Sequence, residues 1–261
     1  MNKWNNVPAI SISWLTSCWK TYHSKRIAES LNIQRLSASE TLLDRWITLW
    51  HHDIDDLERK DHFWLKEKMN YFNKIREENT NLDKSIDNYM LEVLKSRWNI
   101  IETLTAPFLL NNQKALDENI LRIYLQSTVQ ARACRAYLSS KTEKLENLWE
   151  KITEKDNVSR RIINKTRWID IFNQDDIYEN HDLIIDTSDF NEVHNIKRIQ
   201  REKNKVKLLL WNILNLYMVI LKNNKEQIVQ TFRLTKSYVK NEKDIAIIKM
   251  PERYNEIDKM F

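Results

Sequence analysis

The sequence predicts an all-α protein: an elongated helical hairpin or bundle built on one long helix with coiled-coil character, plus a smaller C-terminal helical part. Three observations lead to this prediction. Glycine is absent from the 261 residues and only three prolines occur, so the residues that most often form tight turns are scarce. Apolar residues recur at helical spacing over long stretches without proline. Charged residues make up 30% of the chain, which suits long exposed helical faces.

The absence of glycine also bears on function. A Gly-rich phosphate loop, a dinucleotide fingerprint, a kinase Gly loop and a nucleophile elbow all depend on glycine at fixed positions. We therefore expect none of these motifs, and the sequence argues against the commonest enzyme folds. The chain is predicted not to be an enzyme, with no catalytic residue, no metal and no cofactor.

Residues 1–36 are predicted to hold an irregular lead and an N-terminal amphipathic helix over about 10–33. Residues 37–155 are predicted to form the long helical hairpin, with helices at about 37–104 and 113–155. Ser37 and Glu40 have the spacing of a capping box, which marks the start of the long helix. At about 1.5 Å per residue that helix would be roughly 100 Å long. Its apolar seam is regular over 43–57 and 86–101, and the polar stretch 76–85 between them is a predicted break.

Two further regions follow the hairpin. Residues 156–192 are predicted to form a short helix over about 160–172 and an acidic linker, in which Leu183, Ile184 and Ile185 favour a short extended piece or a docking contact. Residues 193–261 are predicted to form basic and apolar C-terminal helices. The run 206–221 is apolar nearly all round but shorter than the roughly 20 residues of a membrane span. We therefore expect a helix buried in this protein or in a partner, and no integral membrane insertion.

The first functional prediction is a non-enzymatic structural or scaffold subunit of a larger assembly, acting through helix–helix packing in a homo- or hetero-oligomeric complex. Tryptophan is enriched among the residues that dominate protein interfaces. The other interpretation of the same side chains is an ordinary intramolecular core. The predicted partner-binding residues are Trp46, Trp50, Trp64, Trp98, Trp211, Leu214 and Tyr217.

The alternative is a nucleic-acid-contacting accessory protein, since basic residues at helical spacing can meet phosphates. The same residues could instead meet the acidic segment of this chain or an acidic partner. They are Arg160, Arg161, Lys165, Arg167, Lys197, Arg198, Arg201 and Lys205. A third, weaker hypothesis is a helical-bundle metal enzyme around His52 and Asp56, which share a helical face. A solvated polar face explains that pair more simply.

Cys18 and Cys134 are far apart and belong to no paired motif, which favours a reducing intracellular compartment, nucleus or cytoplasm. No secretory signal is visible. Residues 1–28 are basic and carry no acid, so a mitochondrial destination stays open.

Overall fold

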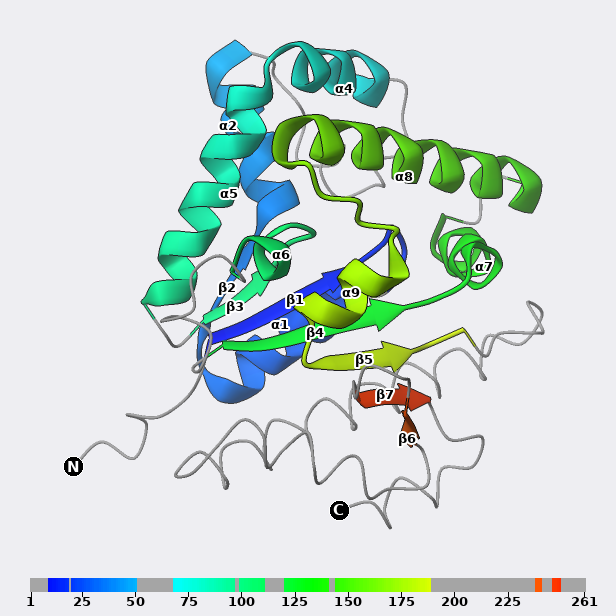
Figure 1. Ribbon diagram of the computed structural model, residues 1–261. Coiled ribbons are helices and arrows are strands. Elements are labelled where there is room, and N and C mark those ends of the chain that lie inside the picture. Colours follow the sequence, from blue (N-terminus) through cyan, green and yellow to red (C-terminus); the bar gives the residue numbers. More distant parts are fainter. Residues whose placement is uncertain are drawn as a thin grey trace.

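The computed structural model describes residues 9–18, 20–50, 68–96, 99–110, 120–140, 144–188, 238–240 and 246–249 (Figure 1). These residues form a β-sheet flanked by helices, so the all-α prediction is wrong. The sheet has seven strands in the order β2-β3-β1-β4-β5-β7-β6. Each neighbouring pair is parallel except β6 and β7, which are antiparallel.

The elements alternate between strands and helices, as parallel sheets require. In chain order they are β1 (Ala9–Trp14), α1 (Lys20–Leu31), β2 (Gln34–Ser37), α2 (Ala38–Trp50), α4 (Lys68–Glu78), α5 (Thr80–Lys95), β3 (Asn99–Glu102), α6 (Ala106–Leu110), β4 (Ile120–Gln126), α7 (Val129–Ser140), α8 (Leu145–Arg167), α9 (Gln174–Asn180), β5 (Leu183–Asp186), β6 (Tyr238–Lys240) and β7 (Ala246–Lys249).

The central strands form because they are short runs rich in isoleucine and leucine. β1 reads Ala-Ile-Ser-Ile-Ser-Trp, and every one of its residues is buried, including the two serines. β4, which reads Ile-Leu-Arg-Ile-Tyr-Leu-Gln, is buried at all but its last residue. Strands of a parallel sheet are covered on both faces, so they lack the alternation of apolar and polar residues seen in half-exposed strands.

The predicted helices divide differently in the structure. The predicted first helix, 10–33, is β1, a loop and α1. The predicted long helix, 37–104, contains α2, α4, α5 and the strand β3, and the predicted return helix, 113–155, contains β4, α7 and the start of α8. The acidic segment carries α9 and β5. Neither the predicted coiled-coil rod nor the predicted hairpin of helices 37–104 and 113–155 is present in the part of the chain that the structure describes.

Helices α2 and α5 pack against β1 and β3 through a core cluster that includes Leu43, Met90 and Ile101. Met90 and Ile101 have no exposed surface. Burying one such side chain contributes about 1.5–3 kcal/mol. A second cluster joins α6 and α9 to β4 and β5, and a third joins α7 to α8.

The strand order places β1 at a topological switch point. The chain leaves β1 through α1 and builds β2 and β3 on one side, while β4 and β5 lie on the other side. In Figure 1 the arrows of β1, β4 and β5 point toward the side of the molecule where α7 lies. Ligands of open α/β sheets bind at the carboxyl ends of the strands near such a switch point. This edge of the sheet is therefore where a site is expected.

No helix among the described residues is both long and apolar enough to cross a bilayer. The apolar run 206–221 lies outside the described residues.

Candidate functional site

The connection from β1 to α1 is the first part of the site. Residues 14–21 read Trp-Leu-Thr-Ser-Cys-Trp-Lys-Thr, and Lys20 is the first residue of α1. A strand, this loop length and a helix that opens with Lys-Thr match the phosphate-loop pattern G-x-x-x-x-G-K-[ST], except that Trp14 and Trp19 stand at its two glycine positions. Ser17, inside the loop, adopts a left-handed backbone with φ 65°. The sequence lacks the glycines of this motif, but the structure has a strand, a loop and a helix in its place.

Lys20 lies at the positive end of a helix of 12 residues, and both features attract anions. Its Nζ is 3.8 Å from Oε2 of Glu102, 3.4 Å from the hydroxyl of Ser39 and 4.4 Å from the ring centre of Trp14. Burial lowers the pKa of Lys20 below its usual range, and the nearby Glu102 carboxylate opposes that shift. A partly buried cation in this position favours a negatively charged ligand.

Glu102 supplies an acid at the carboxyl end of β3. Because Ile12 pairs with Glu102 in the parallel register, this carboxylate lies beside the start of the β1–α1 loop. It is buried and accepts a hydrogen bond from the Thr21 hydroxyl at 3.3 Å, another from the Ser24 hydroxyl, and one from Nε of Arg35 at 2.5 Å. A threonine hydroxyl and a strand-end carboxylate are thus next to each other at the start of α1.

Helices α7 and α8 hold the loop from the other side. The amide of Thr16 donates to Oδ1 of Asp156 on α8 at 3.5 Å. Nη1 of Arg132 on α7 donates to Oδ2 of Asp156 at 2.5 Å and to the carbonyl of Thr16 at 3.2 Å. Both partners of this ion pair are buried. A loop amide therefore already points at an acidic oxygen, as it would at a phosphate.

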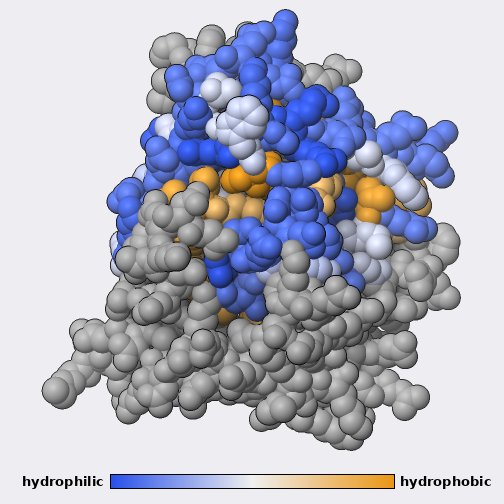
Figure 2. All heavy atoms as spheres, viewed as in Figure 1, coloured by the Kyte–Doolittle hydropathy of each residue, from blue (hydrophilic) through white to orange (hydrophobic). Residues whose placement is uncertain are grey.

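The loop forms one wall of a pocket of about 780 Å³ between the sheet edge and helices α2, α4, α5, α7 and α8. Charged side chains of both signs line it: Lys20, Arg76, Arg135, Lys155 and Arg167, with Glu40, Asp83, Asp87, Glu102 and Asp156. The face drawn in Figure 2 is mostly hydrophilic over its upper part, with a band of hydrophobic residues across the middle. A pocket with this lining suits a polar, charged ligand.

Two lining cations besides Lys20 have altered pKa values. Burial, followed by the positive charge of Lys20, lowers the pKa of Lys155 to about 7, while Asp156 opposes the shift. Burial lowers the pKa of Arg135 to about 10. Arg135 is held by the Ser127 hydroxyl at 3.0 Å and by the carbonyl of Thr187, both beyond the ends of neighbouring strands. Both side chains line the pocket, where burial disfavours their charged forms.

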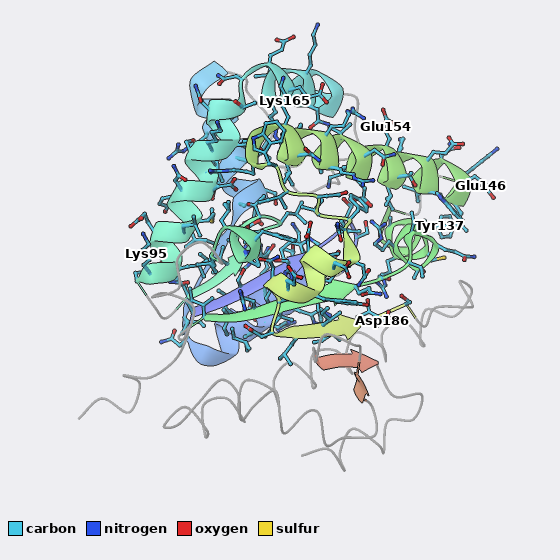
Figure 3. The ribbon with its side chains drawn as sticks, viewed as in Figure 1. Lys95, Tyr137, Glu146, Glu154, Lys165 and Asp186 are labelled. Carbon is cyan, nitrogen blue, oxygen red and sulfur yellow. The ribbon has the colours of Figure 1, made fainter. Side chains whose placement is uncertain are left out.

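Four of the basic residues predicted to contact nucleic acid lie on α8, and each pairs with an acid or donates to a carbonyl of the same chain. Arg160 pairs with Asp170, Arg161 pairs with Glu77 at 3.3 Å, and Lys165 donates to the carbonyl of Glu77 at 2.7 Å. Figure 3 shows Lys165 at the end of α8 that lies under α4. Arg167 pairs with Asp87 of α5 at 3.1 Å. The four residues therefore lie on one helix but form no free basic surface.

The remaining predicted residues are placed as follows. Trp46 and Trp50 lie on α2. Outside the described residues are Trp64, Trp98, Trp211, Leu214, Tyr217, Lys197, Arg198, Arg201, Lys205, His52 and Asp56. Among the described residues no group of three or more His, Cys, Asp or Glu side chains is arranged to hold a metal ion. Burial raises the pKa of the Cys18 thiol to about 11, which makes it a poor nucleophile.

The sequence interpretation missed Lys20, Thr21, Glu102, Arg132, Lys155 and Asp156. For the first two a signal existed, because Lys-Thr follows an isoleucine-rich run at the phosphate-loop spacing. The assumption that a phosphate loop needs glycine concealed this signal. Glu102 and Asp156 carry no local signal, because only the folded sheet and helices bring them to the loop.

Comparison with known proteins gives likeness of structure only. No family model matches the chain, and no curated protein matches it. A shikimate kinase from Bacteroides thetaiotaomicron aligns with a TM-score of 0.41 and 14% identity, covering 78% of this chain and 98% of the other. A gluconokinase from Sinorhizobium meliloti 1021 aligns with a TM-score of 0.34 and 11% identity, covering 57% of this chain and 75% of the other. A function for this chain therefore has to rest on the arrangement of its own residues.

These findings correct the functional predictions. The non-enzymatic scaffold required a long helical rod with tryptophan faces, and the structure has a parallel sheet with a charged pocket at its carboxyl edge instead. The prediction of a coiled-coil scaffold is therefore wrong, and the prediction of a chain without enzymatic activity is corrected with it, because both were drawn from an all-α fold that this chain does not have.

Proposed function

We propose that this chain is a phosphoryl-transfer enzyme of the phosphate-loop kind. The donor's phosphates bind at the β1–α1 loop, and a polar acceptor binds in the adjoining pocket. The observation that carries the proposal is the contact between Thr21, the second residue of α1, and Glu102 at the end of β3, directly beside Lys20. Phosphate-loop enzymes use this combination of a lysine, a hydroxyl and a strand-end carboxylate to hold a polyphosphate and its metal ion.

The donor atoms of the site fit Mg²⁺. This ion prefers oxygen ligands and is usually held by one or two carboxylates together with substrate phosphates, so it needs no larger cluster of protein ligands. The Thr21 hydroxyl and the Glu102 carboxylate are the oxygen atoms that would hold it at the start of α1. When bound there, the ion supplies positive charge that offsets the charge of the phosphates.

The chain's own residues have separate tasks in this proposal. Lys20 and the amino end of α1 bind and orient the donor phosphates. Lys155 and Arg135 reach the pocket from α8 and α7, where they can neutralise charge on the group being transferred. Asp156 and Arg132 fix the loop through Thr16, so that its amides stay in place.

The test measures binding of Mg²⁺–ATP and of inorganic triphosphate by calorimetry, and release of ADP in the presence of candidate polar acceptors. Lys20→Met is expected to weaken binding by roughly tenfold or more, because a hydrogen bond to a charged group contributes about 1.5–3 kcal/mol. Glu102→Gln is expected to weaken the Mg²⁺ dependence of binding.

Lys95→Met is the matched control, since Lys95 pairs with the exposed Glu92 at the end of α5 and does not line the pocket. In Figure 3 it lies on the opposite side of the molecule from Glu146 at the start of α8. Equal affinity in the Lys20 and Lys95 variants would contradict the proposal.

The compartment and partners stay proposals. Cys18 and Cys134 are both free and buried thiols, which supports a reducing intracellular location. The predicted protein partners, and contact with nucleic acid through the residues outside the described part of the chain, have no structural observation behind them.

A further inference from the structure

Glu102 has different neighbours at its two carboxylate oxygens. The Thr21 hydroxyl donates to Oε2 at 3.3 Å, and Nζ of Lys20 lies 3.8 Å from the same oxygen. The other oxygen, Oε1, accepts from Nε of Arg35 at 2.5 Å and from the buried hydroxyl of Ser24. One oxygen of this carboxylate therefore lies beside the residues that bind phosphate and metal, while the protein holds the other oxygen from behind.

Arg35 reaches Glu102 because the two residues lie on neighbouring strands. β2 and β3 pair in parallel, with Arg35 opposite Ile100 and Ser37 opposite Glu102. Side chains two residues apart on a strand point to the same face of a sheet, so the side chains of Arg35 and Glu102 share a face. The Arg35 side chain is 12% exposed and is not part of the pocket lining. It therefore acts on a ligand through the carboxylate and not by direct contact.

The Arg35 guanidinium is itself fixed in place. Its Nη1 and Nη2 donate to the two carboxylate oxygens of Glu40 at 2.9 Å and 3.1 Å, which is a bidentate arrangement. Its Nε also donates to the Ser24 hydroxyl at 3.0 Å. A planar guanidinium with all three nitrogens engaged has little freedom to turn. Because Glu40 lies in the first turn of α2, the guanidinium connects the start of α2 to the end of β3.

We propose that Arg35 is a positioning residue for the metal-binding carboxylate: by holding Oε1 of Glu102, it keeps Oε2 beside the Thr21 hydroxyl, where Mg²⁺ and the donor phosphates bind. This inference deepens the proposed function and rests on it, because it concerns the same carboxylate. Groups that hydrogen-bond to a metal-binding carboxylate orient it, and their loss typically weakens metal binding by about 10- to 100-fold.

Charge alone predicts the opposite effect of removing Arg35. A guanidinium beside the site repels a second cation, so its removal would strengthen Mg²⁺ binding if repulsion were the larger effect. Orientation of Glu102 predicts that Mg²⁺ binding weakens. The direction of the change therefore distinguishes a positioning residue from a neighbouring charge.

The experiment measures the affinity of the full chain for inorganic triphosphate by calorimetry, with and without Mg²⁺. The ratio of the two affinities gives the contribution of the metal, and general damage to the site lowers both affinities without changing this ratio. Arg35→Met is expected to lower the ratio by roughly tenfold. Thermal melting checks that each variant folds.

A double variant tests whether Arg35 acts through Glu102. In the Glu102→Gln background, Arg35→Met is expected to cause no further loss of the ratio, whereas independent effects would add. Arg161→Met is the matched control, because Arg161 pairs with Glu77 in an exposed ion pair and does not line the pocket. It is expected to leave the ratio unchanged.

Two milder variants serve if Arg35→Met does not fold. Arg35→Lys keeps the charge and loses the planar fork. Ser24→Ala removes the other hydrogen bond to Oε1 and changes no charge. Both are expected to lower the ratio, by a smaller factor than Arg35→Met. An unchanged or raised ratio in the folded variants overturns the inference.

The outcomes separate the two proposals. Triphosphate binding that depends on Lys20, together with a ratio that the Arg35 and Ser24 variants leave unchanged, overturns the inference and leaves the proposed function standing. Absence of binding that depends on Lys20 overturns the proposed function, and the inference fails with it.

Discussion

Trp168 shows how one residue can hold a helix end at a cost. It ends α8 in the left-handed conformation, and its amide donates to the carbonyl of Asn164 at 2.8 Å. For a residue with a Cβ, this backbone costs roughly 1–2 kcal/mol. The indole is almost fully exposed, so its packing offsets little of this backbone cost. The position thus favours glycine for reasons unrelated to ligand binding.

Trp168→Gly is therefore expected to raise the free energy of unfolding by about 1 kcal/mol, measured by urea denaturation. Trp149→Gly is the matched comparison, because the same exchange within the first turns of α8 places glycine in a helix and is expected to lower stability by about 1 kcal/mol. A loss of stability at position 168 would show that the exposed indole makes a contact worth more than the backbone cost.

At the scale of elements, Arg167 at the end of α8 ties that helix to α5. Its Nε donates to Asp87 of α5 at 3.1 Å, and its Nη2 donates to the carbonyl of Lys84 at 3.1 Å and to Asn88 at 3.3 Å. The Asp87 carboxylate also accepts from the Thr105 hydroxyl at 2.5 Å. Burial raises the pKa of Asp87 above its usual range, although Thr105 and Arg167 oppose the shift.

Arg167→Met is expected to lower the free energy of unfolding by about 2 kcal/mol at neutral pH, because it leaves a buried carboxylate without its cation. The loss should shrink as the pH falls, since Asp87 without Arg167 takes up a proton more readily and the neutral acid tolerates burial. Arg161→Met on the same helix is the control, because the Arg161–Glu77 pair is exposed and contributes little. Urea denaturation across an acidic pH series checks both. An equal loss in the two variants would contradict this account.

The elements also show what the sequence could and could not predict. Ile86 and Met90, two positions of the predicted apolar seam, are buried in α5, so local helical periodicity was informative there. The strand β3 was not predicted, because Ile100 and Ile101 follow only a few residues later and continue the helical spacing of apolar residues. Short strands buried on both faces lack alternation, and no glycine marks their ends, so nothing in the pattern separated them from helix.

The candidate site was harder to predict than the strands. Lys20 and Thr21 are neighbours in sequence, and their spacing after β1 was readable. Glu102 reaches them only through the pairing of β3 with β1, and Asp156 only through the packing of α8 over the loop. Because the predicted fold class was wrong, the sequence analysis could not bring together the site residues that are far apart in the chain, although each of them is visible in the sequence.

At the scale of the whole molecule, charged residues from four helices surround Lys155. Around it lie Lys20 at the start of α1, Arg76 of α4, Arg132 of α7 and its own neighbour Asp156. Burial and the three cations lower its pKa from 10.5 to about 7, while Asp156 opposes them. Lys155 is therefore a pocket cation that changes its charge near neutral pH.

This arrangement predicts opposite effects of pH on binding and on stability. Below pH 7 Lys155 is charged and can attract a phosphate, and above pH 7 it is neutral in the folded protein, so affinity for inorganic triphosphate is expected to fall by roughly tenfold as pH rises through 7. Lys155→Arg keeps its charge and should remove this part of the pH dependence. The phosphate groups of the ligand also titrate in this range. Because they titrate equally in both experiments, subtracting the Lys155→Arg pH series from that of the unaltered chain removes their contribution.

For stability the sign reverses, because the unfolded chain binds a proton at this lysine up to pH 10.5 and the folded chain only up to about 7. Between these values the unfolded state holds more protons, so the free energy of unfolding rises with pH through this group. Lys155→Met is therefore expected to be more stable than the unaltered chain by a constant amount below pH 7, and the difference should shrink from pH 7 to 10.5. Urea denaturation of both chains across this range measures the difference. A gap that widens with pH would show that Lys155 is charged and well paired in the folded protein, and would remove it as the titrating cation of the pocket.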